Sequence, residues 1–389
     1  MKKIIFLSFI ILTIIACGGL GKIFQGGAIV QKDYLTIIPF NYDYNFAIVE
    51  VSINNKPYNF LVDTGAPTVI SEEIYKDLNI KAADYTIVTD SQGQRNGQEV
   101  AVIPEMFVGD LIYTDIGAVV VSLRDVFEFD CMGIDGILGA NQMAKSFWKF
   151  DYENEKITIT NQLSNYDLTA YKDTLSFTTS TQLTPYVTGY ANDIKTVFTY
   201  DTGSSGGIDI IRSLDGFKNA SSYSQYGSSS VGLYGAIDST SIRTIKLDSL
   251  KIGDVLIGSQ LVDLDDGSLI GNGFMNKHEV VMDWENNHIY LKKLKDFQNT
   301  VDSTYGFNRT IKEKKVLVTS LYKEIETPLQ LNDQILQLNE TDYSNITDEN
   351  VCDIFRTFYN PIEGDSISVV YKRNDEIKKV ILPKVELIR

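Results

Sequence analysis

The chain has 389 residues, of which 43% are hydrophobic, so it can bury large cores in two or three domains and is not a disordered protein. It carries 51 acidic and 35 basic residues, and its formal net charge is −16. Such a charge repels phosphate backbones, so we expect no nucleic-acid partner. Many Tyr and Phe residues, few Pro and short polar clusters favour a mainly β fold.

The first residues predict export. Lys2 and Lys3 precede an apolar run over residues 4–15, which is too short to span a membrane comfortably. The sequence "IIAC" that ends at Cys17 resembles the lipobox of bacterial lipoproteins. This resemblance implies a signal peptide over residues 1–17, lipidation of Cys17 and attachment to the cell envelope. Because no aspartate follows the cysteine, it favours the outer membrane. An ordinary signal peptide is the alternative.

Residues 18–33 begin with glycines and are expected to form a flexible tether. The other two cysteines, Cys131 and Cys352, fall in regions that we assign to different domains. The sequence therefore does not favour a disulfide between them, although one is possible.

The tripeptide Asp-Thr-Gly occurs twice, in "FLVDTGAPTVIS" and in "VFTYDTGSSGGIDI". An acid at the end of an apolar strand is costly to bury unless hydrogen bonds or a shared proton compensate. One copy alone could be a turn, in which Asp63 bonds to the next amides and Gly65 supplies the bend. Two copies raise the question of whether Asp63 and Asp201 are partners.

The surroundings of the two tripeptides repeat as well. A shift of 201 − 63 = 138 positions lays residues 47–65 on residues 185–203 without a gap. Each segment has a two-residue turn, Asn54-Asn55 or Asn192-Asp193, and then a strand that ends at the acid, which predicts a β-hairpin. Downstream, "DGILGANQM" corresponds to "DGSLIGNGFM", and "FDYENEKITI" to "MDWENNHIYL". Landmarks in the same order indicate two homologous lobes.

At these residues the sequence resembles the pepsin-like and retropepsin-like aspartic peptidases, over roughly residues 34–294. In that family each lobe supplies an Asp-Thr/Ser-Gly loop and a later segment of two apolar residues and a glycine that crosses behind it. The resemblance implies a bilobal acid-protease fold, made of two homologous β lobes in one chain. It also implies a cleft covered by hairpin flaps, for which we consider residues 88–100 and 226–235, including Tyr234; ordinary exposed loops are the alternative.

Two close carboxyls that share a proton can activate a water and polarise a peptide carbonyl without a metal or a covalent nucleophile. We therefore predict Asp63 and Asp201 as the catalytic pair. The residues predicted to support the two loops are Thr64, Gly65, Ala66, Thr202, Gly203 and Ser204, and those predicted to pack behind them are Gly139 and Gly271. A hydroxyl at Ser204, where the first loop has Ala66, is expected to make Asp201 the ionised acid and Asp63 the protonated one.

The segment after residue 304 is similar to a PDZ domain, because "NDQILQLN" matches a turn and strand of that family with Asn in place of Gly. In the family, a Gly-hydrophobic loop captures a terminal carboxylate, which assigns Gly306 and Phe307 to peptide binding. Peptide addition to a sheet edge is the expected mode. The alternative is a domain that only packs on the protease lobes.

The predicted fold is therefore mainly β, with a bilobal acid-protease fold followed by a small PDZ-like β/α domain. The predicted parts are a signal peptide (1–17), a tether (18–33), two lobes (34–165 and 166–294), a linker (295–304) and the PDZ-like domain (305–389).

The predicted function is aspartic endopeptidase, with polypeptide substrates, a lipid anchor in the membrane and no cofactor. With two histidines, no HExxH and no CxxC, the sequence gives no support to a metal site, and the run "GSSGG" over residues 203–207 is interpreted as part of the second acid loop. The alternative function is a catalytically inactive, protease-like scaffold that binds peptides.

Overall fold

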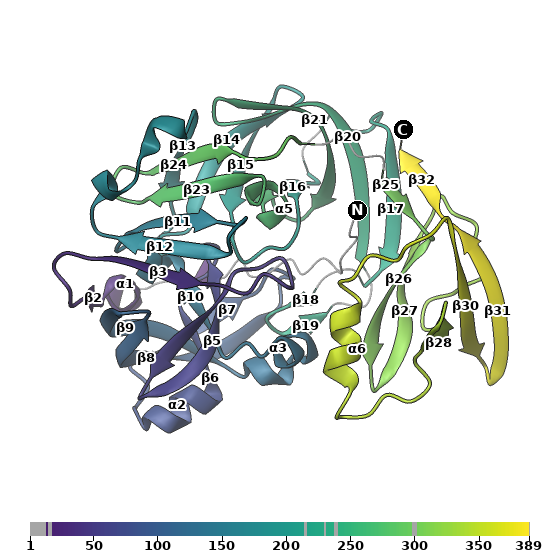
Figure 1. Ribbon diagram of the computed structural model, residues 1–389, viewed down its shortest axis with the longest axis horizontal. Coiled ribbons are helices and arrows are strands. Elements are labelled where there is room, and N and C mark those ends of the chain that lie inside the picture. Colours follow the sequence, from purple (N-terminus) through teal and green to yellow (C-terminus); the bar gives the residue numbers. More distant parts are fainter. Residues whose placement is uncertain are drawn as a thin grey trace.

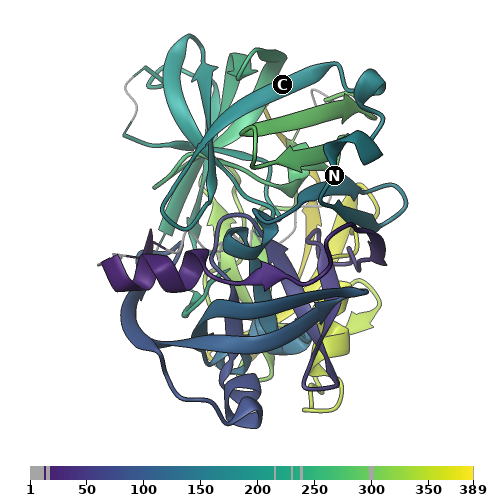
Figure 2. The same cartoon turned by 90° about the vertical axis from the view of Figure 1, so that its left-hand side faces the viewer.

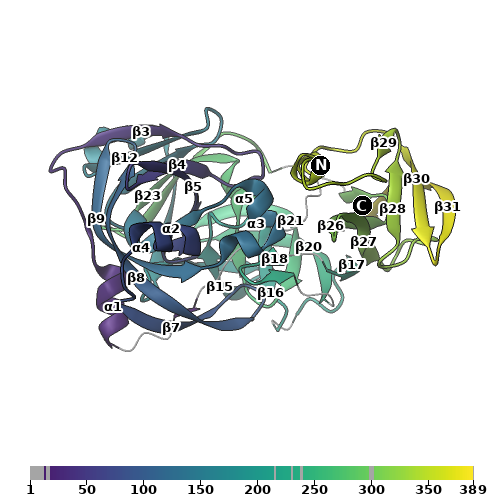
Figure 3. The ribbon, with the colours of Figure 1, turned by 90° about the horizontal axis from the view of Figure 1, so that it is seen from below.

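The computed structural model describes residues 13–14, 18–213, 216–228, 231–236, 240–297 and 302–388. The described chain is mainly β and forms two stacked lobes and a C-terminal unit that projects from one side of them (Figures 1 and 3). In the part of the chain that is described, no helix is long and apolar enough to cross a bilayer. Cys17 lies outside the described residues.

The first lobe is built on a nine-stranded sheet with the order β1-β7-β8-β4-β5-β10-β6-β9-β2. Its strands are β1 (Thr13–Ile14), β2 (Ala28–Ile29), β4 (Ile48–Ile53), β5 (Lys56–Asp63), β6 (Val69–Ser71), β7 (Asp84–Thr89), β8 (Arg95–Val108), β9 (Leu111–Val121) and β10 (Gly136–Gly139). Its helices are α1 (Gly18–Gln25), α2 (Glu72–Leu78), α3 (Phe127–Met132) and α4 (Ala140–Met143), with a 3-10 turn at Leu123–Asp125.

The second lobe repeats the pairings of the first. Its elements are β14 (Pro185–Ala191), β15 (Ile194–Tyr200), β16 (Ile208–Ile211), β17 (Ser222–Gly227), β20 (Thr240–Ile252), β21 (Val255–Asp265), β22 (Leu269–Ile270) and α5 (Asn272–Met275). In the first lobe β10 runs parallel to β5 and antiparallel to β6, and β6 runs parallel to β9. In the second lobe β22, β15, β16 and β21 pair in the same way. The two halves therefore share one topology.

A sheet with strands from both halves joins the lobes, in the order β3-β12-β11-β23-β24-β13. These strands are β3 (Leu35–Pro39), β11 (Phe147–Asp151), β12 (Lys156–Thr160), β13 (Asp173–Thr179), β23 (His278–Asp283) and β24 (His288–Lys293), with 3-10 turns at Leu163–Asn165 and Leu168–Ala170. Figure 2 shows this sheet beside the stacked lobes. The lobes are thus fixed to each other through backbone hydrogen bonds as well as through side chains.

Turn chemistry in the sequence explains the paired hairpins. Asn54 and Asn55 have φ of 51° and 59°, and Asn192 and Asp193 have φ of 45° and 66°. Asn and Asp tolerate this left-handed region better than other side chains, and two such residues in a row form the tight turn that suits a twisted hairpin. The predicted hairpins β4–β5 and β14–β15 are confirmed, as are β11–β12 and β23–β24.

The predicted flexible tether is wrong for residues 18–29. Gly18–Gln25 form helix α1, whose Leu20 and Phe24 side chains are only 6% and 2% exposed. The Phe24 carbonyl also accepts a hydrogen bond from Asn141, and β2 pairs with β9. Two apolar side chains four residues apart give the helix one face to bury, so this segment packs on the first lobe despite its glycines.

The C-terminal unit consists of one small sheet, a second strand pair and a helix. Its elements are β25 (Asp302–Thr304), β26 (Phe307–Lys312), β27 (Lys315–Tyr322), β28 (Gln334–Leu338), β29 (Thr341–Asp342), α6 (Val351–Thr357), β30 (Ser366–Arg373), β31 (Glu376–Pro383) and β32 (Val385–Ile388). Strand β25 lies within the predicted linker, but it pairs with β32 and so belongs to this unit.

The C-terminal unit contacts both lobes. Strand β27 pairs antiparallel with β17, so the sheet of the second lobe continues into the unit. On the first lobe, the Phe355 ring of α6 lies between Tyr44 and Phe127, with ring centroids 6.4 and 5.4 Å away. The Arg356 Nε atom donates to the Tyr44 hydroxyl at 3.3 Å. The unit therefore bridges the two lobes.

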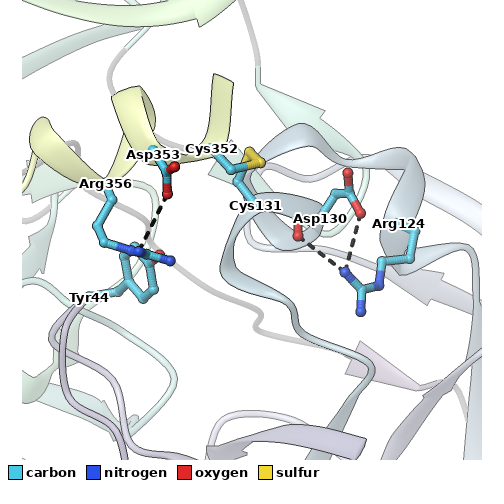
Figure 4. Close-up of a disulfide and its surroundings, with 7 residues drawn as sticks. All are labelled: Tyr44, Arg124, Asp130, Cys131, Cys352, Asp353 and Arg356. Carbon is cyan, nitrogen blue, oxygen red and sulfur yellow. Dashed lines mark hydrogen bonds and ion pairs between the residues drawn. A yellow bond between two sulfur atoms is a disulfide. The ribbon is translucent and has the colours of Figure 1, made fainter. Parts of the chain in front are cut away.

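A disulfide between Cys131 and Cys352 joins α3 to α6, which corrects the prediction that did not favour one (Figure 4). Their Cα atoms lie 4.8 Å apart, within the range that a disulfide requires. The two cysteines are 221 positions apart in the sequence. Only the docking of α6 on the first lobe brings them together, and no local pattern in the sequence encodes that docking.

A small hairpin of the second lobe reaches the first lobe. It consists of β18 (Val231–Gly232) and β19 (Gly235–Ala236), and we call it the cross-lobe hairpin. It lies within the segment predicted as the flap of the second lobe. The predicted flap of the first lobe is the hairpin of β7 and β8.

We expect the double variant Cys131→Ser/Cys352→Ser to unfold at lower denaturant concentration, with a loss of about 2–5 kcal/mol, because a covalent link across a long loop restricts the unfolded chain. Denaturant titration of residues 18–389 without reductant measures the loss. Wild-type protein titrated with reductant is the matched control and should behave like the variant. Equal midpoints with and without the cysteines would show that no disulfide forms.

Candidate active site

Two acids sit at equivalent positions of the two lobes. Asp63 is the last residue of β5, and Asp201 directly follows β15. Both side chains are 0% exposed. The strands β10 and β22 lie beside β5 and β15, and Gly139 is paired with Asp63. Equivalent strands of equivalent lobes thus deliver the two acids.

The threonine after each acid ties the two loops together. The Thr64 amide donates to the Thr202 hydroxyl at 3.0 Å, and the Thr202 amide donates to the Thr64 hydroxyl at the same distance. Each hydroxyl then donates to a carbonyl of the other lobe, Thr64 to Tyr200 at 2.5 Å and Thr202 to Val62 at 2.8 Å. Four buried hydrogen bonds therefore fix the distance between the two loops.

The glycines allow the acids to approach the opposite loop. A Cβ atom on Gly65 would lie 2.7 Å from the carboxyl carbon of Asp201, and one on Gly203 would lie 2.3 Å from that of Asp63. No side chain fits at either position. The Gly65 amide donates to Asp63 Oδ1 at 2.7 Å, and the Gly203 amide donates to Asp201 Oδ1 at 2.8 Å.

The other carboxyl oxygens, Asp63 Oδ2 and Asp201 Oδ2, are buried and accept no hydrogen bond from an N–H or hydroxyl group of the described chain. The two carboxyls bond to each other instead. Buried carboxyls in contact cannot both ionise without a large cost, so they share one proton. This is the state in which one carboxyl can accept a proton while the other donates one.

Burial raises the pKa of Asp63 to about 7, against the opposing effect of hydrogen bonds from Asp201 and from the Gly65 and Ala66 amides. Burial, followed by the charge of Asp63, raises the pKa of Asp201 well above its usual range. Both carboxyls therefore resist ionisation, as expected of a buried pair that shares one proton.

The expected ionisation order, in which Ser204 favours an ionised Asp201, stays a prediction, and the pKa of about 7 at Asp63 favours the opposite order. The Ser204 hydroxyl accepts a hydrogen bond from the Gly206 amide at 3.3 Å, within its own loop. In the first loop, the Ala66 amide supplies the extra hydrogen bond that lowers the pKa of Asp63.

The glycines behind the loops lie against the backbone. A Cβ atom on Gly139 would be 2.1 Å from the Pro67 carbonyl carbon, and one on Gly271 would be 2.6 Å from the Gly206 carbonyl oxygen. Either substitution would force the acid loop to move.

Two buried asparagines also support the loops, and the sequence analysis missed them. Asn141 accepts hydrogen bonds from the amide and the hydroxyl of Thr68, both at 2.8 Å. Asn272 donates to the carbonyls of Thr202 and Ser204, at 2.6 and 2.8 Å. Both follow the landmark glycine by one or two positions in "GAN" and "GN", which is the signal that could have identified them.

The remaining predicted site residues lie apart from the acids. Gly306 precedes β26 with φ of 94°, and its amide donates to the Thr304 hydroxyl at 3.2 Å. Phe307 begins β26 and is 7% exposed. Among the described residues, no cluster of three or more His, Cys, Asp or Glu side chains could hold a metal ion.

We expect Thr202→Val to lower the free energy of unfolding by roughly 1–3 kcal/mol, because it leaves the buried Thr64 amide without an acceptor and the Val62 carbonyl without a donor. Thr202→Ser keeps the hydroxyl and should retain most of the stability. Urea unfolding of both variants measures the difference. Equal losses would mean that the methyl group, and not the hydrogen bonds, stabilises the loop.

Comparison with known proteins agrees with this geometry. Residues 49–142 match the family model described as aspartyl protease. A retropepsin-like aspartic protease from Rickettsia conorii, known from its crystal structure, is 18% identical over 35% of this chain and 93% of its own, with a TM-score of 0.24. No curated protein matches the chain. Asp63 and Gly139 lie within the matched segment, and Asp201 and Gly271 lie beyond it.

Proposed function

We propose that this protein is an aspartic endopeptidase that hydrolyses peptide bonds with Asp63 and Asp201, one from each of two homologous lobes. The observation that carries the proposal is the contact between two buried carboxyls, held by reciprocal threonine hydrogen bonds and sharing one proton. A structural role alone would not explain this pair, because two buried acids in contact cost stability.

The proposed reaction uses the two acids in opposite roles. Ionised Asp63 takes a proton from a water molecule, whose oxygen attacks the carbonyl carbon of the substrate. Protonated Asp201 donates its proton to the carbonyl oxygen, which gives a tetrahedral intermediate. When the carbon–nitrogen bond breaks, the proton on Asp63 moves to the leaving nitrogen. Asp201 recovers its proton from the intermediate, so both acids return to their starting state.

Two further parts of the proposal concern location and partners. Cys17 is the lipid-anchored N-terminus of an exported protein, because the residues before it resemble a lipobox. Cys17→Ser should move the protein from the membrane to the soluble fraction.

The C-terminal unit is PDZ-like and binds peptides along β26, which pairs only with β27 among the described strands. Loss of peptide binding on deletion of residues 305–389, measured by calorimetry, would test this role.

We expect residues 18–389 to cleave an unfolded protein, and we expect Asp63→Asn and Asp201→Asn each to lower kcat/KM by at least about a thousandfold, as removal of an essential acid or base does. Asp254→Asn is the matched control, because that aspartate side chain is 99% exposed and belongs to the second lobe. A statine-type peptide should inhibit the wild type. Cleavage that survives both substitutions would contradict the proposal, and peptide binding without cleavage would favour the scaffold alternative.

The same assay should depend on pH through the two acids. Asp63 must be ionised, so kcat/KM should rise as pH increases through its pKa of about 7. Asp201 must stay protonated, and burial raises its pKa well above the usual range of an aspartate, so activity should fall again as the pH rises through that pKa. An optimum confined to strongly acidic pH would contradict this assignment.

A further inference from the structure

A small cavity with a volume of about 300 Å³ lies at one end of the sheet that joins the lobes. Asp173 and His278, the first residues of β13 and β23, line it at that end of the sheet. Val255, Ile257 and Phe297 form an apolar wall. The residues that line the cavity lie outside the two acid loops, so this is a concave site separate from the candidate active site.

His278 is a buried side chain with one unused polar atom. It is only 1% exposed. Its Nδ1 atom lies 3.3 Å from the Phe274 carbonyl oxygen, and because a carbonyl can only accept, Nδ1 carries the proton. Burial lowers the pKa of His278 to about 4, so the ring is neutral at neutral pH. The Nε2 atom therefore has a lone pair, and it makes no hydrogen bond with the described part of the chain.

Asp173 is a second acceptor of the cavity. Within the described ranges, its carboxylate makes no hydrogen bond and no ion pair. Its negative charge raises the pKa of His278, against the larger effect of burial, so the two side chains lie close enough to interact. A carboxylate and a neutral imidazole nitrogen both need a hydrogen-bond donor. The described chain supplies a donor to neither of them.

The other charged groups that line the cavity already have partners. Asp254 is 99% exposed and forms an ion pair with Lys251 at 3.1 Å. Asp296 is 86% exposed and forms an ion pair with Lys293 at 2.6 Å. Solvent screens such exposed pairs, so they contribute little to the binding of a ligand inside the cavity. The charge that a ligand would meet is thus the carboxylate of Asp173.

The two unused acceptors select the class of ligand. Their best partner is a group that donates hydrogen bonds and carries a positive charge. An ammonium group has three donors, whereas a guanidinium group has five in a rigid plane and would leave most of them unpaired here. A metal ion needs more than two ligands, and the described residues contain no cluster of three that could hold one. The apolar wall suits the alkyl chain of an amine.

We propose that this cavity binds a primary alkylammonium group, with Asp173 and His278 as its hydrogen-bond acceptors and the apolar wall against its alkyl chain. The group belongs either to a free amine or to a lysine side chain of a peptide, since both present the same chemistry. The inference goes beyond the proposed peptidase function and does not rest on it. His278 bonds to α5, the helix whose Asn272 also holds the second acid loop, so the site adjoins a support of that loop.

The histidine rings provide a direct readout, because the chain has only two histidines. His278 pairs with Lys293 at one end of β24, and His288 begins the other end, roughly 17 Å away. Butylamine added to residues 18–389 at neutral pH should shift the NMR signal of His278 Nε2 and leave the ring signals of His288 in place. The variant His288→Gln assigns the two rings.

Four probes in the same titration separate charge, donors and alkyl chain. Butanol has the same chain without the charge, and tetramethylammonium has the charge without a donor. Butylamine should bind at least about tenfold more tightly than either of them. Binding of diaminobutane alone would indicate a free amine as the ligand, and equal or tighter binding of N-acetyl-lysine amide would indicate a peptide lysine.

Two matched variants test the assigned carboxylate. Asp173→Asn keeps the size of the side chain but removes its charge, so the affinity for butylamine should fall at least about tenfold. Asp254→Asn removes the same charge from an exposed position and should change the affinity by less than about twofold.

Three results would overturn the inference. They are a His278 signal that does not move with butylamine, tetramethylammonium that binds as tightly as butylamine, and an unchanged affinity in Asp173→Asn. Unshifted His288 signals in Asp173→Asn show that the variant is folded. If they shift, the comparison of probes on the wild type still decides the question.

Discussion

Two buried carboxyls in contact are the constraint on which this structure depends. Neither Asp63 nor Asp201 has any exposed surface. The Asp63 carboxyl lies against Gly203, and the Asp201 carboxyl lies against Gly65. Desolvation and mutual repulsion would drive such groups apart if the loops were free to move. The reciprocal hydrogen bonds of Thr64 and Thr202 remove that freedom, and the buried asparagines and the sheet shared by the lobes hold the loops from behind. These contacts of the scaffold thereby offset the free-energy cost of holding two buried carboxyls together.

The C-terminal unit adds a second bridge between the lobes. It extends the second-lobe sheet through β17 and β27, and it is bonded to the first lobe through the disulfide of α3 and α6. The cross-lobe hairpin follows β17 in the chain and contacts Asp90 of the first lobe. The unit and the hairpin therefore act on the same two lobes, so the position of the unit bears on how far the lobes can separate.

Local patterns predicted the parts of the fold that local chemistry determines. The turns at Asn54-Asn55 and Asn192-Asp193, and the strands that lead from them to the acids, could be predicted because turn residues and apolar runs act over a few positions. Because these landmarks repeat, the sequence predicted that Asp63 and Asp201 form a pair. The family match over residues 49–142 supports the first half of that hypothesis.

Features that depend on distant contacts were missed. The disulfide requires a helix of the C-terminal unit to dock on the first lobe, and helix α1 is stable because Leu20 and Phe24 find a surface to bury. The Ser204 hydroxyl accepts a hydrogen bond within its own loop, and the Ala66 amide lowers the pKa of Asp63, which composition does not reveal.

The most direct test of the account is a carboxyl-carbon NMR titration of residues 18–389 with 13C-labelled aspartate, assigned with Asp63→Asn and Asp201→Asn. We predict two coupled steps that belong to the pair, both well above the usual range of an aspartate. Two independent titrations near the usual aspartate pKa of about 4 would show that the carboxyls are neither buried nor in contact, and would contradict the account.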